Sequence, residues 1–150
     1  MPLTKIVEII PDRLYAGGVL DLAGWSFIRK KADVVFNVIP IPDTPPFDPA
    51  GRMFIWLPLI DKVAPSLTWT IHAVKIMNEL MTSGLVMYVH DKVGINRLGF
   101  ILTAYFMFNY HLERDEALTY LRQKKPNLRP NAKYMQLLAE YEAYLKSHPN

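Results

Sequence analysis

The chain has 150 residues, of which 51% are hydrophobic and 21% are charged. These values are typical of a globular protein, and we expect residues 1–150 to form a single domain with a substantial core. The chain contains no cysteine, which excludes disulfides, thiolate metal ligands and a catalytic thiol. A formal charge of +3 and an isoelectric point of about 9.1 suit an anionic ligand without requiring one.

No targeting segment or membrane span is expected. The first residues, MPLTKIVEIIPDRLY, lack the long apolar region of a signal peptide, because Lys5 and Glu8 interrupt it. The longest apolar stretch, residues 98–108, is shorter than the ~20 residues that span a membrane. We therefore expect a cytoplasmic monomer that has no membrane attachment.

Strand-like and helix-like segments alternate through the first part of the chain. DVVFNVI is a continuous β-branched and aromatic run, typical of a buried central strand. The segment after it is rich in proline and predicts an exposed connection, which could also dock a partner. In chain order, the predicted segments are a strand (13–18), a helix (21–32), the buried strand (33–39), the proline-rich connection (40–51) and another strand (52–59).

The second part of the chain continues with one more strand and then helices only. Ser66 is a plausible N-cap for a helix that ends at Ser83-Gly84. A strand (85–90), a helix that follows the next loop directly, and two further helices (112–123 and 131–147) come after it. This order predicts an α/β fold, in which helices flank a central, mostly parallel sheet of about four to five strands. Several aromatic and methionine side chains are expected in the core: Trp56, Trp69, Met77, Met87 and Met107.

The loop HDKVGINR, residues 90–97, lies between a predicted buried strand and a predicted helix. In open α/β folds, ligands bind beyond the carboxyl ends of the strands, where loop and helix N–H groups point at the ligand. Gly94 would allow a tight turn, and Arg97 could bind two oxygens of a tetrahedral anion. An ordinary turn that contains an arginine is the simpler interpretation of this loop alone.

The loop also carries a resemblance. His90, Gly94 and Arg97 match three of the four fixed positions of His-Cys-x-x-Gly-x-x-Arg. The stretch therefore resembles the signature of the cysteine-dependent protein tyrosine and dual-specificity phosphatases, in particular the compact archaeal and bacterial type. Asp91 stands in the cysteine position. RLYAGG, VFNV, FIWLPLIDKVAPSL and KKPNLRPN resemble further segments of that family, so the likeness covers nearly the whole chain and implies a dual-specificity phosphatase-like fold.

The resemblance implies roles for particular residues. Asp61, thirty residues before Asp91, would be the general acid. His90 would orient the loop, or else be a buried structural histidine. The phosphate-binding loop would consist of Asp91, Lys92, Val93, Gly94, Ile95, Asn96 and Arg97. No metal or cofactor is implied, and the ligand would be a phosphorylated protein or another phosphoester.

Asp91 decides what chemistry is expected. Beside an arginine and a helix N-terminus its carboxylate should stay ionised, fill the anion site itself, accept hydrogen bonds from the loop and pair with Arg97. A phosphate would then meet a negative charge within ~4 Å, at a cost of roughly 1–4 kcal/mol. Leu98 is a second departure, because the family usually has a serine or threonine there, whose hydroxyl is associated with stabilising the leaving thiolate. Both departures predict an inactive pseudophosphatase that has a binding or regulatory role.

Other interpretations stay open. The chain could be an active phosphomonoester hydrolase, for phosphotyrosine, phosphoserine or phosphothreonine or for a phosphoinositide, whose native cysteine has been replaced at position 91. Asp91 could instead attack phosphorus itself, although Mg²⁺ usually assists that reaction and no second carboxylate adjoins the loop in the sequence.

A further interpretation concerns RNA. GINRLGF, residues 94–100, is also similar to the RNA 5′-triphosphatase branch of the same superfamily. Against a nucleic acid ligand, no clear basic stripe is present. The cations are more simply interpreted as a solvated face: Lys92, Arg114, Arg122, Lys124, Lys125 and Arg129.

Overall fold

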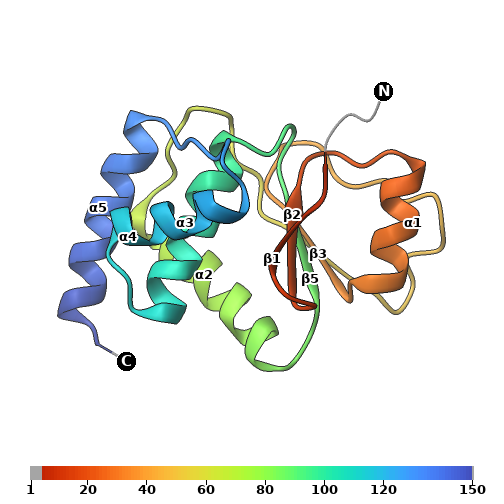
Figure 1. Cartoon of the computed structure of the whole chain (residues 1–150), viewed down its shortest axis with the longest axis horizontal. Helices are drawn as coiled ribbons and strands as arrows, with labels where there is room; N and C mark the ends of the chain where they lie inside the picture. Colours follow the sequence, from red (N-terminus) through yellow and green to blue (C-terminus); the bar gives the residue numbers. More distant parts are fainter. Residues whose placement is uncertain (1–4, 150) are drawn as a thin grey trace.

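The computed structural model describes residues 5–149, in which five strands form one sheet of order β1-β2-β5-β3-β4 (Figure 1). β1 (Val7–Ile10) is antiparallel to β2 (Leu14–Gly17). β2 is parallel to β5 (Met87–His90), β5 to β3 (Val34–Asn37), and β3 to β4 (Met53–Trp56), so these four strands run in one direction. The carboxyl ends of these four strands therefore meet at one edge of the sheet.

Helices cover both faces of the sheet, as predicted. Figure 1 shows α1 (Leu22–Lys31) alone on one side and the other four helices together on the opposite side. Those four are α2 (Leu67–Thr82), α3 (Asn96–Tyr110), α4 (Arg114–Lys124) and α5 (Ala132–Ser147). The mostly parallel α/β fold predicted from the sequence is thus confirmed.

Each face of the sheet has its own hydrophobic cluster. The smaller cluster, beneath α1, consists of Tyr15, Trp25, Ile28, Ala32, Val35 and Tyr88. The larger cluster surrounds α3, whose residues are buried without a break from Arg97 to Met107. A helix that is apolar on all sides must lie inside the molecule. This central position of α3 fixes the loop that precedes it.

The predicted N-cap of α2 is confirmed, because the Ser66 side chain accepts a hydrogen bond from the Trp69 N–H at 3.0 Å. Asn131 caps α5 in the same way, accepting from the Tyr134 N–H at 3.0 Å. Each cap satisfies an N–H group that the first turn of a helix leaves free. No helix in the described part of the chain is long and apolar enough to cross a membrane.

Two expectations need correction. β1 has no counterpart among the predicted strands, because the exposed Glu8 interrupts its apolar run and only Ile9 of its residues is buried. Trp56 was expected in the core but is 47% exposed, since it lies on β4 at the edge of the sheet, where its Nε1 donates to the Ile39 carbonyl. Trp69 is half-buried, whereas Met77, Met87 and Met107 lie in the core as predicted.

Candidate anion-binding site

The loop between β5 and α3 lies at the carboxyl edge of the sheet. His90 is the last residue of β5, and α3 begins at Asn96. The segment that follows β2 holds the loop in place, since the Asp91 N–H donates to the Gly17 carbonyl at 3.3 Å and the Val19 N–H to the Lys92 carbonyl at 3.0 Å. The loop is therefore fixed at the position where ligands bind in open α/β folds.

Gly94 makes the tight turn that the sequence predicts. Its φ is +80°, in the left-handed region that side chains other than glycine rarely adopt. A Cβ atom at this position would also lie 3.0 Å from Lys125 Nζ and 3.3 Å from the Gly17 carbonyl carbon. The loop conformation thus depends on glycine here.

The carboxylate of Asp91 accepts hydrogen bonds from its own loop, as predicted. Its side chain is buried, with 1% of the residue exposed. Oδ1 accepts from the Gly94 N–H, and Oδ2 accepts from the Leu98 N–H at 3.0 Å. These donors belong to the loop and to the first turn of α3, which are the groups that could otherwise hold an anion.

Arg97 contradicts one expectation. Its guanidinium was predicted to pair with Asp91, but Nη1 donates to the Leu59 carbonyl at 3.0 Å and Nε lies 3.9 Å from Oδ1 of Asp61. Among the described residues, no ion pair joins Arg97 to Asp91, because the guanidinium is directed at Leu59 and Asp61 instead. Arg97 Nε is buried and donates no hydrogen bond within residues 5–149. One buried donor therefore faces the half-exposed carboxylate of Asp61.

His90 connects the loop to the proline-rich connection. Its Nδ1 lies 3.0 Å from the Asp91 carbonyl oxygen, and its Nε2 lies 2.8 Å from Oδ1 of Asp43. A neutral imidazole carries a single N–H and can donate to only one of these two oxygens. Sequence reasoning gave Asp43 no role, because this contact joins residues 47 positions apart.

Lys125 is a site residue that sequence reasoning missed. It was assigned to a solvated face, but it is only 6% exposed and its Nζ donates to the Gly94 carbonyl at 2.6 Å and to Asn127 Oδ1 at 2.8 Å. Burial lowers the pKa of the Lys125 ammonium, and the negative charge of Asp91 partly opposes that shift. Pro126 ends α4 at this point, but nothing in the sequence shows which of two adjacent lysines turns inward.

The remaining loop residues differ in exposure. Lys92 and Val93 are exposed, whereas Ile95 and Asn96 are half-buried. Leu98 is fully buried in the larger hydrophobic cluster, so its side chain packs in the core while its N–H binds Asp91. The loop therefore presents little more than two side chains to solvent.

Two backbone N–H donors hold the buried carboxylate of Asp91, and the charge of the Lys125 ammonium acts on it. Asp91 is a poor candidate nucleophile, because both of its oxygens accept hydrogen bonds and it is almost inaccessible. Two further carboxylates do approach the site in space, Asp61 beside Arg97 and Asp43 beside His90. Within the described part of the chain, no three His, Asp or Glu side chains are grouped so that they could hold a metal ion.

The family described as "Dual specificity phosphatase, catalytic domain" matches residues 25–144, and the chain belongs to it. Among curated relatives, the dual specificity protein phosphatase Mpk3 of Drosophila melanogaster is 29% identical over 148 residues, which are 95% of this chain and 35% of that protein. Rat dual specificity protein phosphatase 12 is 28% identical over 143 residues, 91% of this chain and 41% of that protein. The chain thus spans less than half the length of these two relatives.

Solved structures share the fold. Human DUSP28 superimposes with a TM-score of 0.81 at 22% identity, covering 94% of this chain and 95% of that one. Archaeal Tk-PTP in its active form gives a TM-score of 0.82 at 21% identity, covering 92% and 96%. Human tyrosine phosphatase-like serine/threonine/tyrosine-interacting protein gives 0.80 at 21% identity, covering 94% and 97%. The chain is thus a dual-specificity phosphatase-fold protein without a cysteine.

Proposed function

We propose that this chain is a pseudophosphatase, an inactive member of its family that acts by binding or regulation. The observation that carries the proposal is Asp91, whose two oxygens accept the loop N–H groups. In the family that the loop resembles, a thiolate attacks phosphorus and loop N–H groups stabilise the charge on the phosphoryl oxygens. A chain without cysteine has no thiolate to supply.

The charge of Asp91 also opposes the binding of substrate. A phosphate that entered the loop would have to displace a carboxylate or lie beside it, which costs roughly 1–4 kcal/mol between water-like and surface-like dielectrics. The parts that surround the loop remain suited to a phosphoester, since Arg97 has a free buried donor and Asp61 lies next to it. The ligand we propose is therefore a phosphorylated protein or another phosphoester that is bound weakly and not hydrolysed.

The name of one structural relative supports a role of this kind. Human tyrosine phosphatase-like serine/threonine/tyrosine-interacting protein is described by its name as phosphatase-like and interacting. It has the same fold as this chain, and its name describes interaction and not hydrolysis. The fold is therefore compatible with the role that we propose.

The direct test is hydrolysis of an aryl phosphate by the chain and by Arg97→Met. We expect neither protein to exceed the buffer rate. The proposal fails if the chain shows turnover that persists after repurification and that Arg97→Met abolishes. Activity that is equal in both proteins identifies a contaminant, since Arg97 is the cation nearest to the general acid position.

The second candidate function is an active phosphatase whose native cysteine stood at position 91. The short distance of 3.9 Å between Arg97 Nε and Asp61 Oδ1 favours this second function, because phosphoryl transfer requires a cation and an acid close together. Asp91→Cys should then hydrolyse one of four substrates: phosphotyrosine, phosphothreonine, a phosphoinositide or an RNA 5′-triphosphate. If Asp91→Cys is inactive but the double variant Asp91→Cys/Leu98→Ser hydrolyses a substrate, then the leucine at position 98 also prevents turnover.

A further inference from the structure

A second feature lies at the opposite edge of the sheet from the loop. A cavity of about 480 Å³ is formed by the end of α1, the start of β3 and the turn before β4. Four cations line it, and we name it the basic cleft after them: Arg29, Lys30, Lys31 and Arg52. Asp33 joins this edge to the start of β5 by donating its N–H to the Val86 carbonyl, whereas the anion-binding loop follows the far end of β5 (Figure 1). Four strand residues at ~3.3 Å each separate the two sites by roughly 13 Å.

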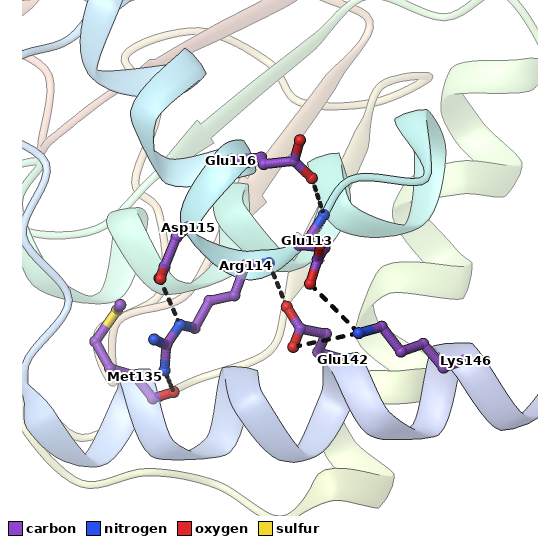
Figure 2. A network of polar contacts seen from close by, with 7 residues as sticks. All are labelled: Glu113, Arg114, Asp115, Glu116, Met135, Glu142 and Lys146. Atoms are coloured by element: carbon purple, nitrogen blue, oxygen red, sulfur yellow. Dashed lines mark hydrogen bonds and ion pairs between the residues drawn. The ribbon is translucent and has the colours of Figure 1, made fainter.

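The basic cleft concentrates the charge of the whole chain. Asp33 is the carboxylate among the lining residues, and its Oδ2 already accepts the Val86 N–H at 2.9 Å. Four cations and one carboxylate give a formal charge of +3, which equals the net charge of the chain. None of the four cations forms an ion pair with another described residue, in contrast to Arg114 and Lys146, which pair with carboxylates between α4 and α5 (Figure 2). The remaining residues of the chain carry equal numbers of positive and negative charges, so the net positive charge of the chain equals the charge of the basic cleft.

Two of the cations are held in place. Arg52 donates from Nη1 to the Ala32 carbonyl at 3.1 Å and from Nη2 to the Arg29 carbonyl, at the end of α1. The guanidinium carbons of Arg29 and Arg52 lie 5.3 and 5.2 Å from the centre of the Phe47 ring. Such cation–π contacts order long side chains before a partner arrives, which reduces the entropy lost on binding.

The cleft fits an acidic peptide better than a nucleic acid. Single-stranded nucleic acids bind through exposed aromatic faces on which the bases stack. Phe47 offers none, because two guanidiniums and the Trp25 ring already contact it. Met53, which is 48% exposed, adds an apolar side chain to the lining instead. We propose that the basic cleft binds a segment of a partner protein that is rich in Asp and Glu and contains an apolar residue.

The test is fluorescence anisotropy with a labelled oligoglutamate peptide that contains one leucine, titrated with the full chain at low salt. We expect saturable binding that weakens as salt is added. Lys30→Glu/Lys31→Glu should weaken it by about tenfold or more, because it reverses two of the four positive charges, both on exposed side chains.

The matched control is Lys75→Glu/Lys133→Glu, which changes the net charge equally on exposed positions of α2 and α5. This variant should bind the peptide nearly as well as the parent chain. Equal loss in both double variants, or no binding by the parent, overturns the proposal. Tighter binding of an oligouridylate than of the peptide overturns the choice of partner.

Discussion

At the scale of single residues, Asp91 and Lys125 each form a hydrogen bond with the backbone of Gly94. The Gly94 N–H donates to Asp91, and the Gly94 carbonyl accepts from Lys125. The two side chains are 1% and 6% exposed, so water screens their opposite charges little. The charges of Asp91 and Lys125 therefore act on each other inside the molecule, although no ion pair joins the two side chains among the described residues. This arrangement accounts for a carboxylate being tolerated in a buried anion site.

A double-mutant cycle tests that interaction. Lys125→Met should lower the free energy of unfolding by about 1–3 kcal/mol, because it removes the hydrogen bond to the Gly94 carbonyl and the positive charge near Asp91. In the Asp91→Asn background the same change should cost less, with a coupling of about 1 kcal/mol in urea unfolding. Identical costs in both backgrounds would show that Lys125 acts only through its hydrogen bonds.

At the scale of elements, the loop joining β5 to α3 depends on the backbone of Gly94. Gly94→Ala should destabilise the chain by more than the ~1–2 kcal/mol of a left-handed residue, since the new Cβ would also meet Lys125 and Gly17. Gly84→Ala is the matched control, with φ +84° and no atom within 4 Å of the added Cβ. Thermal unfolding of the two variants gives the comparison, and equal losses would contradict the contact argument.

The elements also show how far the sequence can be interpreted. Ser66 and Gly94 are recognisable because a cap and a tight turn each require particular residue types at one position. The contacts of Asp43 with His90 and of Lys125 with Gly94 are not recognisable, because they join distant segments through side chains whose direction depends on packing. The ion pair of Arg97 was assigned to the wrong carboxylate for the same reason.

At the scale of the whole molecule, the four most deeply buried tyrosines link stability to alkaline pH. Burial raises the pKa of Tyr105 and Tyr134 to about 12, and it raises that of Tyr88 and Tyr141 as well. In the unfolded chain each ionises near its ordinary value of 10.0. The folded chain thus binds more protons above that value, so stability is full below pH 10 and falls as pH rises from 10 through about 12.

Unfolding measured in steps across that range, together with tyrosinate absorbance, tests this expectation. The four most deeply buried tyrosines, Tyr88, Tyr105, Tyr134 and Tyr141, should ionise only as the chain unfolds. Complete ionisation of all eight tyrosines near pH 10 without loss of native structure would contradict the burial argument.

The central claim is that Asp91 occupies the anion site. Calorimetric titration of inorganic phosphate into the parent chain and into Asp91→Ser tests it most directly, because serine removes the charge and leaves Arg97 and the loop N–H groups in place. We predict weak binding by the parent and binding that is about fivefold to several hundredfold tighter in the variant, as a charge cost of roughly 1–4 kcal/mol requires. Equal affinity in the two proteins would contradict the account.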